Sequence, residues 1–501
     1  MSKRKPSRVH DTLIIGAGFG GLGAAIRLQQ SGHQDFIILE RSDRVGGTWR
    51  DNQYPGAACD IPSNLYSFSF APNPDWSRTY SGAGEIFGYI KGLVEQFKLG
   101  PALRYQQDVT GLRFVEEQGY WEATTAAGDC WRARAVVMAA GGLANPGWPN
   151  INGRESFAGK VMHSARWDHD YDFSGKKVAV IGTGASAIQI VPELVKQAGQ
   201  VKVFQRTAPW VLPRMDYASP DWARKLFAKA PRSQQLVRDA LFWTHESVAL
   251  AVIWNSPLTR VTERVASAHL ARQVKDGWLR RQLTPHYTIG CKRVLISNDY
   301  YPALQQPNCK LITWPIDCIN ERGIRTAEGI EHQFDCIVFA TGFDVQKTGT
   351  PFPVQGLGGR ELAEEWQGGA QAYKSVNVSG YPNLHIIFGP NSGPGHNSAL
   401  VYMEAQIDYA VQGIEALLRG DHAYLDVIPA VQTQHNLELQ KRLARTNWNS
   451  GCKSWYLTAD GFNATMYPGF ATQYAQQLAR FELADYRAVD RAAPAARRAA
   501  G

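Results

Sequence analysis

The chain has 501 residues, of which 44% are hydrophobic and 20% are charged. This length is too great for a single core and this composition excludes wholesale disorder, so the sequence predicts two to four globular domains. The net charge of +8 looks spread along the chain rather than gathered in one stripe, which excludes a nucleic-acid interface and favours an anionic cofactor as partner.

The first predicted unit is a short apolar strand followed by a glycine-rich loop and a helix. The loop has the spacing G-x-G-x-x-G at Gly16, Gly18 and Gly21, and the next apolar strand ends at Glu40. In such a unit the glycines allow a tight turn, the approach of a pyrophosphate and close helix packing, while the acid binds a ribose hydroxyl. The spacing predicts a dinucleotide site; the alternative is a plain glycine-rich turn.

A second unit of the same kind begins near residue 177. Its loop has the spacing G-x-G-x-x-A and contains Gly182, Gly184, Ser186 and Ala187. The strand that follows ends not in an acid but in Arg206 and Thr207. Because an acid would repel a 2′-phosphate and an arginine would bind it, this unit is expected to take NADPH rather than NADH. The alternative is that Arg206 is only a surface residue.

The order of these units predicts an α/β fold with two Rossmann-like dinucleotide-binding domains, one nested in the other, and a helical insertion. Residues 133–142 and 334–344 resemble each other as buried strands that end in glycine, one for each domain. The expected boundaries are 1–150 and 380–488 for the first domain, 151–212 and 286–379 for the second, 213–285 for the insertion and 489–501 for a flexible tail.

The insertion contains four tryptophans at helical spacings, which are expected to be core residues rather than substrate contacts: Trp222, Trp243, Trp254 and Trp278. Its most apolar stretch, 236–254, includes Arg238, Asp239, His245 and Glu246. A spanning helix would have to bury all four of these polar side chains, which excludes a transmembrane segment. The sequence is still compatible with a helix that lies on a membrane surface and binds it weakly. The seven cysteines are scattered, without C-x-x-C or metal-ligand spacing, which predicts reduced thiols, a cytoplasmic location and no metal site.

Two dinucleotide domains in one chain indicate a flavin reduced by a nicotinamide. The electrons then pass to a disulfide, to another acceptor or to oxygen. A disulfide reductase needs a suitably spaced cysteine pair, which the sequence does not show, so oxygen is the favoured acceptor.

The stretch FAGKVMHSARWD carries the most specific signal in the chain. Phe157, Gly159, His163, Trp167 and Asp168 fill the pattern F-x-G-x-x-x-H-x-x-x-W-D. This pattern resembles the fingerprint of the type I Baeyer–Villiger monooxygenases, which are related to the flavin-containing monooxygenases. Segments 44–70, 290–301 and 451–456 are similar to further family segments in the same order, whereas 388–398 is closer to the flavin-containing type.

The resemblance implies that the protein binds FAD and NADPH and inserts one atom of molecular oxygen beside a ketone carbonyl, through a flavin peroxide, to give an ester or lactone. It places Arg293 as the cation that stabilises developing negative charge and Asp60 as the carboxylate that orients it. An ordinary structural ion pair is the alternative. Lys292 is implied to bind the 2′-phosphate together with Arg206 and Thr207.

Further residues are predicted near the bound nucleotides, the substrate or the domain junction. Trp49 and Tyr66 are expected near the flavin, although Tyr66 also fits a core position. Trp455 is expected in a substrate loop or in plain packing. His163 and Trp167 precede the second loop, which favours a role in coupling the domains over proton transfer; a hydrogen-bonded linker histidine with no dynamic role is the alternative. A monomer or homodimer is expected, and the competing functions are N- or S-oxygenation and redox sensing without turnover.

Overall fold

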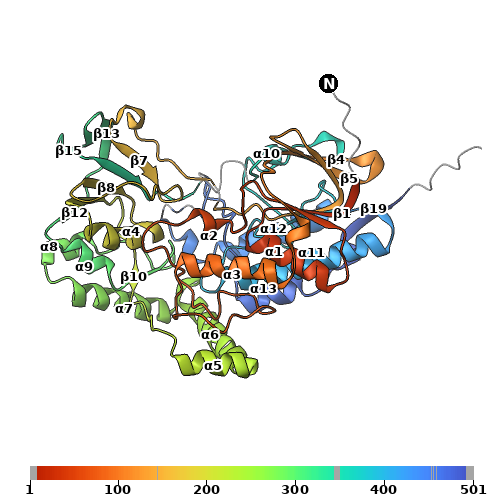
Figure 1. Cartoon of the computed structure of the whole chain (residues 1–501), viewed down its shortest axis with the longest axis horizontal. Coiled ribbons are helices and arrows are strands. Elements are labelled where there is room, and N and C mark those ends of the chain that lie inside the picture. Colours follow the sequence, from red (N-terminus) through yellow and green to blue (C-terminus); the bar gives the residue numbers. More distant parts are fainter. Residues whose placement is uncertain are drawn as a thin grey trace, which may run out of the picture.

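The computed structural model of the chain describes residues 8–143, 145–343, 350–452, 454, 456–458 and 460–491. Two sheets with their covering helices lie side by side, and a helical segment projects at the lower edge (Figure 1). Trp455 and the segment 492–501 of the predicted tail fall outside the described residues. Among those described, no helix is long and apolar enough to cross a membrane.

The first sheet is built from eight strands in the order β17-β4-β5-β6-β1-β2-β3, with β18 paired to β6. They are β1 (Val9–Ile15), β2 (Phe36–Leu39), β3 (Leu103–Arg104), β4 (Val109–Val115), β5 (Tyr120–Thr125), β6 (Cys130–Met138), β17 (Val354–Gln355) and β18 (Leu384–Ile386). The central strands β6, β1 and β2 run parallel, and their apolar runs are buried because helices cover the sheet. The covering helices include α1 (Phe19–Gln30), α3 (Ala83–Gln96) and α11 (Ala399–Arg419).

The second sheet is wholly parallel, in the order β12-β9-β8-β16-β7. Its strands are β7 (Lys160–His163), β8 (Lys177–Ile181), β9 (Gln200–Phe204), β12 (Cys309–Ile312) and β16 (Cys336–Phe339), with helices α4 (Ala185–Val195) and α9 (Tyr300–Leu304). All of them lie in the chain between β6 and β17 of the first sheet. The nested α/β architecture predicted from the two loops is therefore confirmed.

The chain rejoins the first sheet earlier than residue 380. Strand β17 pairs with β4 and its Val354 is buried in the core of the first sheet. Two residues of strand are too short to give a recognisable alternation, which is why the sequence did not reveal it. At the other end, β20 (Tyr486–Asp490) pairs with β19 (His422–Val427) up to Asp490, so the predicted start of the tail at 489 falls inside a strand.

The smaller elements complete the fold. They are α2 (Thr48–Asp51), α10 (Leu362–Glu365), α12 (Pro429–Leu443), α13 (Ala471–Leu478), the pair β10 (Val211–Leu212) and β11 (Leu295–Ile296), and the antiparallel ribbon β13 (Ile316–Asn320), β14 (Gly323–Thr326) and β15 (Glu331–Gln333). The pair β10 and β11 brackets the helical insertion. It thereby brings residue 295 next to the end of the second nucleotide unit.

The insertion consists of α5 (Asp221–Lys229), α6 (Pro231–Val252), α7 (Pro257–Gln273) and α8 (Gly277–Gln282). The predicted helices are present, but the prediction that their tryptophans are core residues is wrong for three of the four. Trp222, Trp243 and Trp278 are 69%, 62% and 65% exposed, and only Trp254 packs against a core cluster. Helical spacing identifies an apolar face but does not say whether a neighbour covers it.

A buried carboxylate anchors α6 to the first domain. Glu246 of α6 is 4% exposed and accepts hydrogen bonds from His396 Nε2, Asn397 Nδ2 and the first turn of α13, at Ala471 N and at Thr472 N and Oγ1. Burial raises the pKa of Glu246, but the hydrogen bonds from His396 and Thr472 outweigh it and bring the value down to about 2. The carboxylate is therefore charged at neutral pH and holds the insertion in place.

Glu246→Gln should lower the free energy of unfolding at pH 7 by about 3 kcal/mol, because an amide has one acceptor oxygen where several donors converge. The ordinary pKa of 4.5 is lowered in the folded state, so the stabilisation is present above pH 4.5 and is lost as the pH falls towards 2. Urea unfolding of both proteins from pH 7 to pH 3 should show the difference narrowing below about pH 4.5. Glu95→Gln, at an exposed position of α3, is the control; an equal effect there would refute the anchor.

Candidate active site

The first glycine loop lies between β1 and α1. Gly16 has φ +102°, and a Cβ there would lie 2.5 Å from Ala139 O; a Cβ on Gly21 would lie 1.9 Å from Gly16 O. These two positions therefore admit only glycine. Gly18 is the N-cap residue of α1 and, having no side chain, leaves the helix N-terminus open to an anion. The loop fits a pyrophosphate, as the sequence predicts.

Glu40 stands at the end of β2, beside this loop. Its Oε2 accepts from Ala17 N at 2.9 Å, and its Oε1 accepts from Ser42 N at 2.9 Å and Arg50 Nη1 at 2.8 Å. The carboxylate is buried and rigidly oriented at the carboxyl edge of the sheet. Carboxylate oxygens each accept more than one hydrogen bond, so this arrangement fits a ribose whose hydroxyls donate to it.

The second loop repeats this geometry before α4. Gly182 has φ +119°, and a Cβ there would lie 2.4 Å from Ala340 O. At Gly184 an added Cβ would meet no atom within 4 Å, so protein packing does not require glycine there, whereas a closely approaching ligand would. Ala187 is fully buried under the loop, and Ser186 lies half-buried in the first turn of α4. This loop fits a second pyrophosphate.

A cavity of about 640 Å³ lies beyond the end of β9, beside this loop. Arg206, Thr207 and Lys292 line it together, although Lys292 is distant in the chain. Burial and the positive charge of the neighbouring Arg206 lower the pKa of Lys292. The described lining residues include no aspartate or glutamate: Gln205, Arg206, Thr207, Ala208, Arg281, Gln282, Thr284, His286, Tyr287, Lys292, Thr313 and Cys452. Such a set fits a phosphate dianion.

Two members of this cavity, Arg281 and His286, were missed by the sequence reasoning. Both lie where the insertion returns to the second domain. The adjacent arginines at the end of the last insertion helix were a signal, but nothing in the sequence places that helix beside Arg206.

Arg293 and Asp60 form a forked ion pair. Arg293 Nε donates to Asp60 Oδ2 at 2.9 Å, and Nη2 donates to Oδ1 and Oδ2 at 2.7 Å. The Asp60 carboxylate raises the pKa of Arg293 further above its already high value, so the guanidinium stays charged. The arginine side chain is 45% exposed. The pair predicted from sequence is thus brought together, with its guanidinium partly open to solvent.

The two aromatic residues predicted beside the flavin contact each other. Trp49 Nε1 donates to Tyr66 Oη at 3.1 Å, and their rings meet edge to face at 5.6 Å. Burial raises the pKa of Tyr66, so it stays a neutral phenol. Trp49 belongs to α2, which begins directly after Gly47, and Gly47 lies against Gly18 of the first loop. Both aromatics therefore lie close to the predicted pyrophosphate site.

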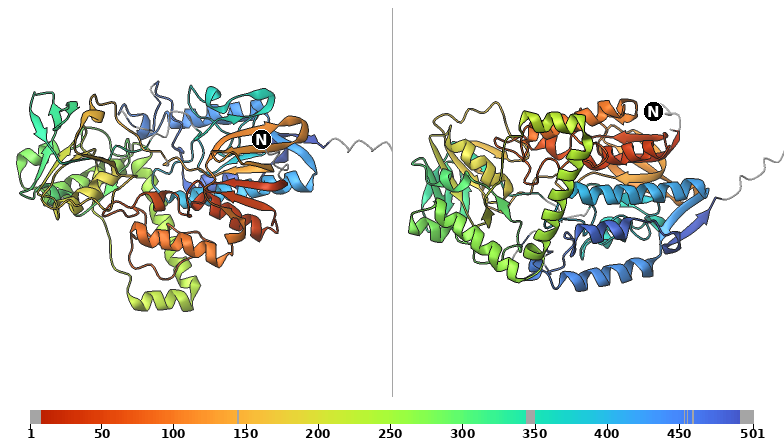
Figure 2. Two further views of the ribbon diagram at one scale, coloured as in Figure 1. Left: turned by 45° about the horizontal axis from the view of Figure 1, so that its top comes forward. Right: turned by 90° about the horizontal axis from the view of Figure 1, so that it is seen from below.

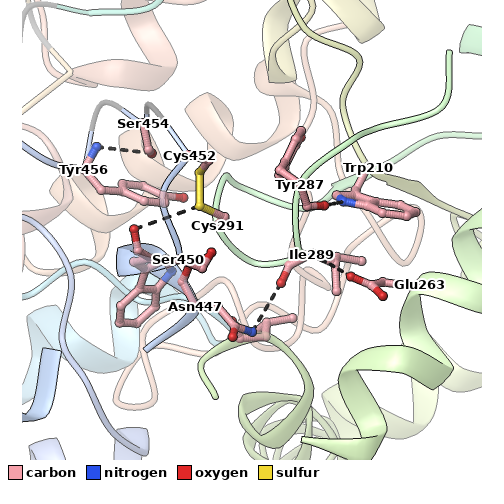
Figure 3. The surroundings of a disulfide bond; sticks show 12 residues. Trp210, Glu263, Tyr287, Ile289, Cys291, Asn447, Ser450, Cys452, Ser454 and Tyr456 are labelled. Carbon is pink, nitrogen blue, oxygen red and sulfur yellow. Dashed lines mark hydrogen bonds between the residues drawn. A yellow bond between two sulfur atoms is a disulfide. The ribbon is translucent and has the colours of Figure 1, made fainter. Parts of the chain in front are cut away.

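The prediction that the cysteines are all reduced is wrong for one pair. Cys291 and Cys452 form a disulfide across 161 residues of chain (Figure 3). The bond ties the segment that bears Lys292 and Arg293 to the segment that follows α12. Asn447 supports the same junction, because its Nδ2 donates to Ile289 O at 3.3 Å. Such a separation is invisible to spacing rules, which recognise only neighbouring cysteines.

His163 lies at the end of β7 between two segments that cross from one sheet to the other. Its ring contacts the ring of Trp148, on the segment after β6, with 5.2 Å between ring centroids. It also contacts the ring of Phe343, on the segment after β16, with 6.1 Å between ring centroids. Burial lowers its pKa to about 4, so the ring is neutral at pH 7, and its Nδ1 accepts from Ala165 N at 3.1 Å. Trp167 stacks on Phe173 at 5.5 Å within the second domain.

Comparison with known proteins gives consistent results. A family described as "Pyridine nucleotide-disulphide oxidoreductase" matches residues 13–236. A protein named Baeyer-Villiger monooxygenase from Streptomyces coelicolor is 44% identical, covering 96% of this chain and 93% of the relative; one from Pseudomonas aeruginosa is 42% identical, covering 94% and 90%. The solved structure of an oxidized steroid monooxygenase bound to NADP is 28% identical, with a TM-score of 0.84, covering 96% of this chain and all of that one. A cyclohexanone monooxygenase from Rhodococcus, 24% identical with a TM-score of 0.86, shares the fold.

Proposed function

The chain belongs to the Baeyer–Villiger monooxygenase family, and from this premise we propose which of its residues carry each step. The protein is an NADPH-dependent flavoprotein monooxygenase that inserts one oxygen atom beside a ketone carbonyl. When bound, FAD supplies the oxygen activation and NADPH supplies the hydride. The chain's own work is to bind the nucleotides and the ketone, to exclude water and to stabilise charge.

The first loop with Glu40 holds FAD, and the second loop with its basic cavity holds NADPH. Gly16, Gly18 and Gly21 leave room for the FAD pyrophosphate, and Trp49 and Tyr66 border the flavin. In the second domain Arg206, Thr207 and Lys292 bind the 2′-phosphate. The observation that supports this division is the absence of any carboxylate among the described residues that line the 640 Å³ cavity.

Arg206→Ala should raise the KM for NADPH by about 10- to 100-fold, which corresponds to the loss of one charge-assisted hydrogen bond. The KM for NADH should change little, because NADH lacks the 2′-phosphate. Steady-state kinetics with both nucleotides measure the ratio of the KM for NADPH to the KM for NADH. Arg260→Ala, at an exposed position of α7, is the control. Equal effects on both nucleotides would show that Arg206 does not bind the phosphate.

Arg293 is the group on which ketone oxygenation depends. Attack on a carbonyl carbon converts its oxygen into an alkoxide, and a fixed guanidinium lowers the energy of that charge without titrating. The Asp60 carboxylate accepts hydrogen bonds from two nitrogens of the Arg293 guanidinium, so the position of the positive charge is fixed. The forked pair is the single observation that supports this assignment. Incubation of the FAD-loaded enzyme with NADPH, oxygen and a panel of ketones and sulfides, followed by mass analysis, tests it: esters support the assignment and sulfoxides alone contradict it.

His163 is a coupling residue rather than a base. Its ring lies between the two crossing segments, and a pKa of about 4 leaves it without a titration between pH 5 and 8. His163→Ala should lower the product formed per NADPH consumed several-fold and leave the FAD content unchanged. The pH profile of the wild type from 5 to 8 should show no step assignable to His163, and His169→Ala, exposed nearby in sequence, is the control. Unchanged coupling would reduce His163 to packing.

The domain boundaries near residues 150, 212 and 285, a cytoplasmic location and a monomeric or homodimeric state stay proposals. The use of NADPH supports the cytoplasm, where that nucleotide is available. Trp455 stays a proposed member of a substrate loop.

A further inference from the structure

Large apolar side chains are exposed along the lower edge of the molecule. Val237 and Val248 of α6 are exposed on another side of that helix, at 38% and 39%. The others are Trp222 (69% exposed), Leu226, Leu236 (70%), Trp243 (62%) and Leu250 on α5 and α6, and Leu258, Val261 and Val265 on α7. We refer to these eight residues as the underside patch. Of the helices that carry it, α5 and α6 project from the body, and α6 lies in front when the molecule is seen from below (Figures 1 and 2). Soluble monomers rarely expose so many large apolar groups in neighbouring elements.

The patch follows one face of α6. Leu236, Ala240, Trp243, Ser247 and Leu250 recur at intervals of four and three residues, which places them along a single stripe. All five are exposed. The three large apolar members, Leu236, Trp243 and Leu250, therefore lie on one side of the helix, with Ala240 and Ser247 between them.

The opposite face of α6 is fixed to the body by buried polar groups. Arg238 Nη1 donates to Asn64 O at 3.0 Å and to Ser67 O at 2.8 Å, and Glu246 receives the donors of His396 and α13 described above. These directional contacts set the rotation of the helix about its axis. Trp243 and Leu236 are consequently held outward, and the helix cannot turn to bury them without breaking the Arg238 and Glu246 networks.

The insertion is also strongly basic. Residues 213–285 contain twelve lysines and arginines against six aspartates and glutamates, a net charge of +6 out of +8 for the whole chain. The positive charge is therefore concentrated here, contrary to the even spread read from the sequence. Lys225, Lys229 and Arg232 are exposed between Trp222 and Leu236, with Asp221 and Asp239 as the exposed acids of the same two helices.

We propose that the underside patch docks on an anionic lipid membrane. Tryptophan and leucine side chains insert among headgroups and upper acyl chains, while lysine and arginine neutralise lipid phosphates; a helix with both features lies in the interface plane. Charge decides against a second copy of the chain, because two copies meeting through this face would bring like charges together. The docking is peripheral. It leaves the proposed nucleotide sites, at the glycine loops of the two sheets, uncovered, so the bound enzyme can still catalyse its reaction.

Sedimentation with vesicles tests the proposal on the FAD-loaded full chain. Vesicles of 30% phosphatidylglycerol in phosphatidylcholine should bind the protein, and pure phosphatidylcholine vesicles should bind it at least tenfold less. The double variant Trp222→Ser/Trp243→Ser should lose binding at least tenfold. Lys225→Gln/Lys229→Gln should lose it on the order of thirtyfold, because each lysine near an anionic surface contributes about a factor of five.

Trp314→Ser is the matched control, since Trp314 is 55% exposed but lies after β12, outside the insertion. All replaced side chains are exposed, so NADPH oxidation in the absence of vesicles should equal that of the wild type in every variant. Equal binding to both kinds of vesicle, or equal loss in the Trp314 variant, would overturn the proposal. So would a dimeric wild type that becomes monomeric on Trp222→Ser/Trp243→Ser in analytical ultracentrifugation, because the patch would then be a contact between copies.

Discussion

Arg293→Ala should lower kcat/KM for ketone oxygenation by about a thousandfold, the upper range for removing one group that stabilises a developing oxyanion. The structure gives the reason: the guanidinium is fixed by three hydrogen bonds to Asp60 and its side chain is 45% exposed. FAD content should be unchanged, because the residue lies outside the first glycine loop. Product analysis and stopped-flow reduction of the flavin by NADPH separate the two properties.

The matched control is Arg325→Ala. Arg325 pairs with Asp317 at 2.6 Å and is 48% exposed, close to the 45% of Arg293, but it lies on β14 of the antiparallel ribbon. Its loss should leave ketone turnover unchanged. Arg293→Lys should fall between wild type and alanine, because it keeps the charge and loses the fork. Wild-type turnover in Arg293→Ala would show that the pair with Asp60 is only structural.

Gly182→Ala should abolish NADPH binding while the protein keeps its FAD. A Cβ at this position would lie 2.4 Å from Ala340 O, and the backbone has φ +119°, so the loop must move away from β16. We expect the KM for NADPH to rise at least a hundredfold. The measurements are the KM from steady-state kinetics and the flavin absorbance per mole of protein.

Two further glycine variants make this result specific. Gly16→Ala, with the same geometry in the first loop, should instead yield protein without FAD. Gly175→Ala tests the backbone alone, since its φ is +70° but a Cβ there would meet nothing within 4 Å; it should cost about 1 kcal/mol of stability and no nucleotide affinity. Loss of both nucleotides in Gly182→Ala would indicate general misfolding and contradict separate sites.

The parts of the fold that could be predicted are those set by local patterns. Each glycine loop, its strand and its helix are contiguous in the chain, so periodicity and spacing define them. The pair of Arg293 and Asp60 lies 233 residues apart and came from the family resemblance rather than from any local rule. Strand β17 has only two residues, which is too few for an alternation of apolar and polar side chains to show that the chain has returned to the first sheet.

The features that could not be predicted are contacts between parts of the chain that are distant in sequence. The contact between Glu246 and His396 joins residues 150 positions apart, and no local pattern in the sequence pairs them. The tryptophans of the insertion have core-like spacing, but their exposure depends on how Arg238 and Glu246 orient α6. The disulfide between Cys291 and Cys452 is another contact of this kind.

That disulfide adds a third covalent bridge between the two halves of the molecule. The other two are the chain segments after β6 and after β16, which pass each other at the His163 ring. Lys292 and Arg293 lie next to the disulfide in the chain, and Arg293 is paired with Asp60 of the first domain. Separation of the two halves at this point is therefore resisted by a covalent bond as well as by the ion pair.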